Sequence, residues 1–244
     1  MEEQAKSPKP LGGRSYGSIP HLPGSRRGPM DYGLSEDQAR MLTERANDKR
    51  DRVVVQEKLD GSNVAAVKLG GKILAITRAG YLAESSPFAQ HHGWARWVEA
   101  NATALDAMLA EGERVCGEWM MVAHGTRYAL PHGPFVAFDL RTAKRRAGVD
   151  EVMGRCWPYG LPTPRVISDG PPISVAAVLA MLEPSGHGAI DPVEGAVWRC
   201  ERGDVTKPTI LAKFVTASKL DGCYLSKEPG DADVRNTWAG GWTP

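Results

Sequence analysis

Residues 52–78 read RVVVQEKLDGSNVAAVKLGGKILAITR, and this stretch decides the fold more than any other part of the chain. Runs rich in valine, alanine and isoleucine occupy 52–58, 63–69 and 72–78, and the short spacers DGS and GG separate them. Strand-forming runs between glycine-containing spacers predict a meander of antiparallel strands. The first run ends in Lys58-Leu59-Asp60-Gly61, which places a lysine at the end of a strand, beside a turn.

The sequence on either side of this stretch predicts further short strands and a few helices. Ser35 and Gln38 have the spacing of a capping box, so we expect a helix to begin there. The predicted helices span 35–50, 94–110 and 174–183, and the further predicted strands span 114–121, 134–140, 195–200 and 209–215. This mixture predicts an α+β fold of antiparallel sheets flanked by helices.

The two ends of the chain differ in composition from its middle. Residues 1–30 are rich in Gly, Pro, Ser and Arg and have little periodicity, so we expect an extended basic arm. Residues 31–226 contain all the predicted strands and helices and form the expected domain. Residues 227–244 are polar, with glycine and tryptophan, and predict a tail with no regular element.

The bulk composition narrows the class of protein. The 244 residues are 42% hydrophobic and 24% charged, which is typical of a soluble globular chain. No stretch approaches the ~18 consecutive apolar residues of a membrane span, and the four cysteines are widely scattered. We therefore expect a cytoplasmic protein with no membrane partner. The net charge of +1 gives no general electrostatic reason to bind nucleic acid.

The sequence features typical of nucleic-acid binding, zinc binding and a phosphate-binding loop are weak or absent. Two groups of basic residues stand out: Arg14, Arg26 and Arg27 near the start, and Arg141, Lys144, Arg145 and Arg146 in the middle. Such a charge run is more typical of a solvated turn than of a binding patch. The histidines, including His91-His92, lack the spacing of zinc ligands. The segment LGGRSYGS lacks the GK[ST] ending of a phosphate-binding loop.

Six short motifs carry the chemistry. They are Lys58-Leu59-Asp60-Gly61, Thr77-Arg78-Ala79-Gly80, Gly117-Glu118-Trp119, the run 135–140 (FVAFDL), the run 194–199 (EGAVWR) and the run 211–215 (LAKFV). A K-x-D-G match arises by chance in about one chain in twenty of this length. Taken singly, each motif has an ordinary explanation: a hairpin turn, a solvated arginine, a core phenylalanine or a surface carboxylate. The ordinary explanations do not predict this order.

In this order the motifs resemble those shared by DNA ligases, RNA ligases and mRNA capping enzymes, and in detail they are most similar to the RNA ligases. The resemblance extends over about residues 16–225. It implies an ATP-dependent enzyme that joins 5′-phosphate and 3′-hydroxyl RNA ends through a lysyl-AMP intermediate. It also implies ATP and Mg²⁺ or Mn²⁺ as cofactors and RNA as the partner.

The resemblance also implies roles for individual residues. Lys58 matches the nucleophile and Lys213 a second catalytic cation. The residues implied to contact the nucleotide are Glu57, Lys58, Asp60, Asn63, Arg78, Glu118, Phe138 and Lys213, with Phe138 stacking on adenine and backbone groups around Gln56 and Glu57 reading its edge. The residues implied to help hold the metal are Glu194, Asp60 and Glu118. Asp139 would support the strand of Phe138, and the segment 16–19 (YGSI) would line the nucleotide or RNA site.

A nucleophilic lysine poses a problem of protonation. With an ordinary pKa of about 10.4, only about one lysine in a few thousand is a neutral amine at neutral pH. We therefore expect the site to lower the pKa of Lys58 through burial, the neighbouring Lys213 and a bound metal ion.

Two departures from the family pattern leave alternatives open. The last motif often carries a second lysine, but Val215 occupies that place, and Lys219 is the nearest residue that could compensate. With about fifty residues before Lys58 and about thirty after Lys213, we also expect no full accessory OB-fold, so RNA would bind to the core surface, the basic arm or a partner. A DNA ligase, a capping-type nucleotidyltransferase and a non-catalytic nucleotide or RNA-end sensor on the same fold remain as alternatives.

Overall fold

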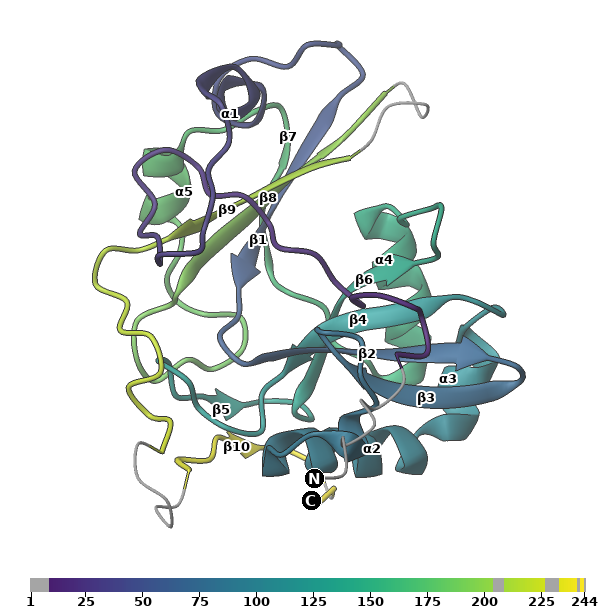
Figure 1. The fold of residues 1–244 in the computed structure, drawn as a ribbon. Helices are drawn as coiled ribbons and strands as arrows, with labels where there is room; N and C mark the ends of the chain where they lie inside the picture. The colour runs from purple at the N-terminus through teal and green to yellow at the C-terminus, as the bar shows by residue number, and fades with distance from the viewer. Residues whose placement is uncertain (1–8, 204–208, 227–232, 241, 244) are drawn as a thin grey trace, which may run out of the picture.

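Two four-stranded antiparallel sheets form the centre of the molecule (Figure 1). The computed structural model describes residues 9–203, 209–226, 233–240 and 242–243. The sheet that we name the Lys58 sheet has the order β7 (Val166–Gly170), β1 (Arg52–Lys58), β8 (Gly195–Glu201) and β9 (Ile210–Val215). The sheet that we name the Phe138 sheet has the order β3 (Lys72–Thr77), β2 (Ser62–Leu69), β4 (Arg114–Trp119) and β6 (Phe135–Arg141). The predicted α+β class is confirmed.

The predicted meander is wrong at its first step, because β1 and β2 belong to different sheets. Strand β1 pairs with β7 and β8, whereas β2 pairs with β3 and β4. Asp60 and Gly61 therefore form a junction between the sheets instead of a hairpin turn. A Cβ on Gly61 would lie 2.7 Å from the carbonyl oxygen of Trp119, so the junction requires glycine. The Asp60 carboxylate accepts a hydrogen bond from the Gly125 N–H at 2.7 Å, which fixes the junction to a distant loop.

Two of the three predicted helices begin at their predicted N-caps and end earlier than predicted, whereas the third begins at residue 89 and not at residue 94. Helix α1 (Glu36–Thr43) begins with the predicted capping box of Ser35 and Gln38 but ends well before residue 50. The Asp48 and Asp51 side chains accept hydrogen bonds from nearby backbone N–H groups, and such local bonds compete with a helix. Helix α5 (Val175–Ala180) begins at its predicted cap, Ser174, whose hydroxyl accepts from the Ala177 N–H.

The predicted helix over 94–110 is two helices, α2 (Ala89–Ala100) and α3 (Ala102–Met108). The break lies at Asn101, whose side chain donates to the Trp97 carbonyl at 2.8 Å. The sequence did not predict α4 (Val149–Cys156), β7, or the two-residue strands β5 (Ala129–Leu130) and β10 (Thr237–Trp238), which pair with each other. Strand β10 lies in the tail predicted to have no element. Residues 1–8 of the predicted arm and 227–232, 241 and 244 of the tail lie outside the described residues.

Each sheet packs against its own helices (Figure 1). Helix α2 covers the Phe138 sheet with Trp94 and Trp97, which are core residues as predicted; the Trp94 ring lies 4.6 Å from that of Phe135. Helices α1 and α5 lie beside the Lys58 sheet, where Leu42 and Trp198 are buried in a second core. The described part of the chain contains no helix with the length and apolar character needed to cross a membrane.

The described part of the N-terminal arm packs against the domain. The Leu22 side chain is fully buried, and the Leu22 N–H donates to the Lys213 carbonyl at 2.9 Å. The Arg141–Arg146 charge run is a turn whose middle residues are exposed, whereas Arg146 reaches inward to Asp139 at 2.8 Å. Both segments therefore contribute to the region where the two sheets meet.

Candidate functional site

A cavity of about 760 Å³ lies between the two sheets and the N-terminal arm. Its volume is in the range of small-molecule sites, which are typically about 300–1,000 Å³. The predicted residues that line it are Glu57, Lys58, Asp60, Asn63, Arg78, Glu118, Phe138 and Lys213. Tyr16, Gly17 and Ile19 of the arm also line it. Glu194 lies behind the wall and contacts Lys58. The fold thus brings residues from all six motifs to one place.

Lys58 is the last residue of β1, and its side chain is 20% exposed. Its Nζ donates to Glu194 Oε2 at 2.7 Å. The prediction that the protein's own groups lower the pKa of Lys58 is wrong. Burial lowers this pKa, but the carboxylates of Glu194, Glu118 and Asp60 raise it more, so it lies above its ordinary value. Lys58 is therefore an ammonium group at neutral pH.

Lys213 differs from Lys58 although both line the same cavity. Burial and the charge of Lys58 lower the pKa of Lys213, against the opposing effect of Asp31 at 3.5 Å. The arm holds this residue on both sides along the backbone: the Lys213 N–H donates to Pro20 O, and the Leu22 N–H donates to Lys213 O, both at 2.9 Å. A partly desolvated cation at a fixed place is suited to offset the charge of an anionic ligand.

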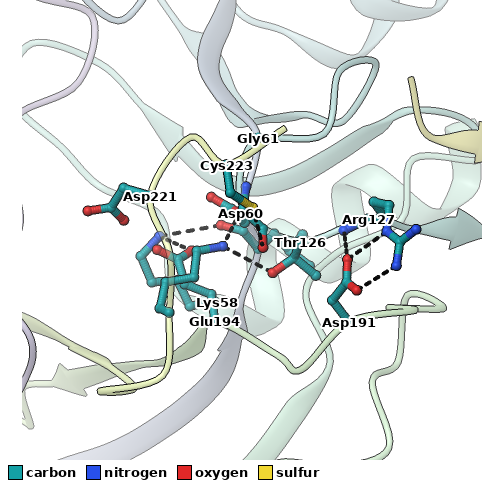
Figure 2. Close-up of polar contacts among 12 residues, drawn as sticks. Lys58, Asp60, Gly61, Thr126, Arg127, Asp191, Glu194, Asp221 and Cys223 are labelled. Carbon is teal, nitrogen blue, oxygen red and sulfur yellow. Dashed lines mark hydrogen bonds and ion pairs between the residues drawn. The ribbon is translucent and has the colours of Figure 1, made fainter. Parts of the chain in front are cut away.

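Three carboxylates, those of Glu194, Glu118 and Asp60, lie around Lys58, and each already has a protein donor. Figure 2 labels two of these residues, Asp60 and Glu194. Glu118 Oε1 accepts from the Gly61 N–H at 3.1 Å, Glu194 from Lys58, and Asp60 from Gly125. Burial raises the pKa of Glu118 to about 7, with a further contribution from Glu194, and burial also raises the pKa of Glu194. Burial thus favours the protonated, neutral forms of Glu118 and Glu194 over their charged forms.

The carboxylates predicted to help hold a metal do not form a preformed metal site. Among the residues with described positions, no group of three or more His, Cys, Asp or Glu side chains is arranged to hold a metal ion. Mg²⁺ commonly takes one or two carboxylates and completes its shell with water and substrate phosphates. Asp60, Glu118 and Glu194 fit this second kind of site and not a cage made of protein alone.

Phe138 supplies an aromatic wall, and the residues behind it hold that wall in place. The Tyr16 ring meets Phe138 edge-on, with centroids 5.2 Å apart. Arg146 lies over the Tyr16 ring at 5.5 Å and pairs with Asp139, which is fully buried. Burial raises the pKa of Asp139, and the charges of Arg146 and Arg199 oppose that rise. The expected support of the Phe138 strand by Asp139 therefore has a structural basis.

The remaining predicted residues differ in how free their polar groups are. Asn63 Oδ1 is buried and has no hydrogen-bond partner, which leaves an acceptor in the cavity wall for a ligand. Arg78 is exposed and donates to Ser18 Oγ at 2.9 Å. The Glu57 carboxylate is already bound by Ser185 at 2.5 Å and by the Gly186 N–H at 2.8 Å. The Glu57 N–H is bound to the Arg165 carbonyl.

The sequence missed several residues of the cavity. Ser86, Phe88, His91, His124 and Arg199 also line it, and none stands in a motif whose spacing marks it as a site residue, apart from the arginine that ends EGAVWR. Val215 is buried, and its N–H donates to Ser25 Oγ at 2.9 Å. Lys219 is not part of the cavity wall; its ammonium binds Asp60. It therefore does not replace a second lysine at the cavity in this structure.

Comparisons with known proteins show a family and solved structures of similar fold. The family model described as RNA ligase matches residues 51–215. Among solved structures, an archaeal ATP-dependent RNA ligase (form 2) is similar with 24% identity and a TM-score of 0.50, over 82% of this chain and 48% of that one. A point mutant of a Naegleria gruberi RNA ligase with ATP and Mn is similar with 16% identity and a TM-score of 0.52, over 84% of this chain and 61% of that one.

These structural likenesses are likenesses of fold, since the identities are low. The chain spans about half the length of the archaeal ligase that it matches. A comparison with curated proteins gave no match.

Proposed function

This chain belongs to the RNA ligase family, and from that premise we propose that it is an ATP-dependent RNA ligase with Lys58 as its nucleophile. One observation carries the proposal: the Lys58 ammonium lies in the wall of a nucleotide-sized cavity with its nitrogen 2.7 Å from a carboxylate, and Phe138 and Lys213 line the same cavity. A lysine, a proton acceptor, an aromatic wall and a second cation are the groups that lysine adenylylation needs.

In the first step, Glu194 takes a proton from the Lys58 ammonium through the hydrogen bond that joins them. The neutral amine attacks the α-phosphorus of ATP in line with the departing group. A P–N bond forms, the bond between the α-phosphorus and the bridging oxygen breaks, and pyrophosphate leaves. The raised pKa of Glu194, which burial causes, makes this carboxylate a better proton acceptor than an exposed one. Lys213 offsets the charge that develops on the α-phosphate.

The cavity wall orients the nucleotide. Phe138 offers a ring face to adenine, and the unpartnered Asn63 oxygen accepts a hydrogen bond from a ribose hydroxyl. Arg78, at the exposed side of the cavity, contacts phosphate oxygens. The Glu57 side chain takes no direct part in this scheme, because its carboxylate holds the loop at Ser185 and Gly186.

A divalent cation, Mg²⁺ or Mn²⁺, completes the site we propose and supplies charge neutralisation for the phosphates. Asp60, Glu118 and Glu194 are the residues that would help hold it, together with phosphate oxygens and water. The protein's own contribution is to keep these carboxylates around Lys58.

RNA is the proposed polynucleotide. In the second step AMP passes from Lys58 to the RNA 5′-phosphate, and the P–N bond breaks as a P–O–P bond forms. In the third step an RNA 3′-hydroxyl attacks that phosphate, a phosphodiester forms and AMP leaves with the bridging oxygen. The exposed Arg14 and Arg27 of the arm offer positive charge to the RNA backbone. We propose a cytoplasmic location, where unpaired cysteines such as the buried Cys116 and Cys156 stay reduced.

The test is to incubate the purified protein with α-labelled ATP and Mg²⁺ or Mn²⁺ and to separate it by denaturing electrophoresis. We expect a labelled protein band that Lys58→Ala abolishes. Lys68→Ala is the matched control, because Lys68 pairs with Asp106 and does not line the cavity. No labelled band with any nucleotide would refute the enzyme and leave the non-catalytic sensor.

A second arm of the test identifies the substrates. We expect the protein to join 5′-phosphate and 3′-hydroxyl ends of RNA in the presence of ATP and to leave the matching DNA ends unjoined. Joining of DNA alone would favour the DNA ligase alternative. Labelling by α-labelled GTP and not by ATP would favour the capping-type nucleotidyltransferase.

A further inference from the structure

The segment 216–226, which we name the closing segment, links the two halves of the molecule beyond the end of β9. It begins against the Lys58 sheet, where the Thr216 N–H donates to the Glu194 carbonyl at 2.9 Å. It ends at the loop that follows β4, where the Tyr224 N–H donates to the His124 carbonyl at 2.9 Å. Between these ends, Asp221 pairs with Arg26 of the arm at 2.6 Å. The closing segment lies just after residues 51–215, which match the family model.

Lys219, the lysine of the closing segment, reaches the site described above with its ammonium group. Its side chain is only 2% exposed. Its Nζ donates to Asp60 Oδ2 and, at 3.0 Å, to Thr126 Oγ1. The Thr126 hydroxyl in turn donates to the Pro192 carbonyl at 3.3 Å, two residues before Glu194. Figure 2 shows Thr126 beside Asp60, Lys58 and Glu194.

The Asp60 carboxylate is held from two segments at once. Lys219 and the Gly125 N–H both donate to the same oxygen, Oδ2, so together they fix the rotation of this carboxylate in the cavity wall. Gly125 permits the close approach, because a Cβ there would lie 2.8 Å from Lys219 Nζ and would meet the Leu220 carbonyl. A lysine this deeply buried is costly unless a carboxylate compensates it, so the pair is maintained as a unit.

A lysine at this place could either contact the nucleotide directly or hold another residue that does, and the position of Lys219 favours the second role. Lys219 does not line the cavity, whereas Asp60 does. A nucleotide in the cavity therefore meets Lys219 only through Asp60. We propose that Lys219 is a positioning residue for the adenylylation reaction, which holds Asp60 in the orientation that the reaction uses; this rests on the proposed function.

The experiment compares four variants with the wild-type full chain. Lys219→Met keeps the unbranched shape and most of the length of the side chain and removes its charge. Lys68→Met removes an ion-paired lysine outside the cavity and is the matched control. Asp60→Asn and the double variant Asp60→Asn with Lys219→Met complete a double-mutant cycle. Each protein is assayed for the single-turnover rate of lysyl-AMP formation over a range of ATP concentrations, and its melting temperature is measured.

We expect Lys219→Met to lower the maximal adenylylation rate by about 10- to 100-fold, which is typical of partners that orient a functional side chain. The ATP concentration for half the maximal rate should change by less than about threefold, because Lys219 does not touch the nucleotide. In the Asp60→Asn background the same substitution should cost less than about twofold. A purely structural lysine would lower the melting temperature without this dependence on Asp60.

Equal rates for Lys219→Met and Lys68→Met would overturn the proposal, and so would independent, additive losses in the cycle. If Lys219→Met alone does not fold, Asp60→Asn is compared with the double variant, which removes both charges of the pair. A further loss of more than about twofold in the double variant would show that Lys219 acts independently of Asp60 and would overturn the proposal. Absence of label on the wild-type protein would instead refute the proposed function, and this inference with it.

Discussion

The two sheets contribute different things to one cavity. The Lys58 sheet brings charged groups to it, with Lys58 and Lys213 in the wall and Glu194 just behind. The Phe138 sheet brings an aromatic ring and the acceptor of Asn63, and it rests on a core of tryptophan rings. Neither sheet forms the cavity alone, and the junction at Asp60 and Gly61 joins the two sheets whose residues together line it. We infer that the Lys58 sheet governs the rate of the chemical step and the Phe138 sheet governs nucleotide affinity.

The largest effect that would test this division is in the Lys58 sheet. Lys213→Met should lower the single-turnover adenylylation rate by about 10²- to 10³-fold, as the loss of a charge-stabilising group in other active sites does. The ATP concentration for half the maximal rate should change little, because the charge of Lys213 matters most as charge develops on the α-phosphate. Lys68→Met is again the control. A large rise in that concentration at an unchanged rate would break the division.

The next effect is in the Phe138 sheet. Phe138→Ala should raise the ATP concentration for half the maximal rate by about 10- to 100-fold, since stacking on an aromatic ring contributes about 1–3 kcal/mol per base. Phe138→Tyr keeps the ring and should stay close to wild type. The measurement is the same ATP titration of the adenylylation rate. If Phe138→Leu equals wild type, the ring acts only as apolar packing, and the stacking role is wrong.

The sequence predicted the strands of both sheets except β7, but not how they pair. Alternation and turn residues are local signals, and they located β1, β2 and β3 within a residue or so. The Asp60-Gly61 pair has the same local signal in a hairpin and in a junction between sheets. The choice is made by contacts across long distances in sequence, from Asp60 to Gly125 and from Gly61 to Trp119. No local pattern contains that information.

Prediction of the site from the sequence meets the same limit. The order of the motifs predicted which residues meet in the cavity, but not the charge state of Lys58. That depends on a balance between burial and carboxylates from three elements, and only the folded geometry sets its sign. Lys219 was noted from the sequence as a neighbour of the last motif, but its partner Asp60 lies 159 residues away along the chain. Contacts of this kind are fixed by the fold and not by spacing.

A smaller effect concerns the loop that leads into the Lys58 sheet. Burial, with the charges of His132 and Arg165, lowers the pKa of His187 to about 4. Its ring nitrogens bind His132 at 2.7 Å and the Arg165 N–H at 3.2 Å. The unfolded chain binds a proton near pH 6.5 and the folded protein does not. The contribution of the neutral His187 ring to the stability of the folded protein is therefore fully present above about pH 6.5 and is lost as the pH falls from there toward about 4.

The measurement is urea unfolding of the wild type and of His187→Asn. Wild-type unfolding free energy should fall by about 1–3 kcal/mol between about pH 7 and about pH 4.5, and the variant should lose less over the same range. His92→Asn serves as the control, since His92 lies outside this contact and binds the Ser86 carbonyl. Equal slopes for the wild type and His187→Asn would exclude His187 as the source.

The smallest effect is a loss of stability as the pH rises, which is opposite in direction to the effect of His187, and it comes from the Phe138 sheet. Burial, together with the charge of Glu194, raises the pKa of Glu118 from 4.5 to about 7. Between these values the folded protein holds a proton that the unfolded chain has lost, so the contribution of Glu118 to stability falls as the pH rises from about 4.5 to about 7. Glu118→Gln removes this dependence because its side chain does not titrate.

Glu118→Gln should therefore be more stable than wild type by about 1 kcal/mol at about pH 8, allowing for screening at a partly exposed side chain, and close to wild type at about pH 4.5. The exposed Glu99→Gln on α2 is the matched control. A variant that is less stable than wild type at high pH would show that Gly61 needs a charged acceptor at this position. A stabilised variant with slower adenylylation would instead show that the charge on Glu118 is kept for the reaction at the expense of the fold.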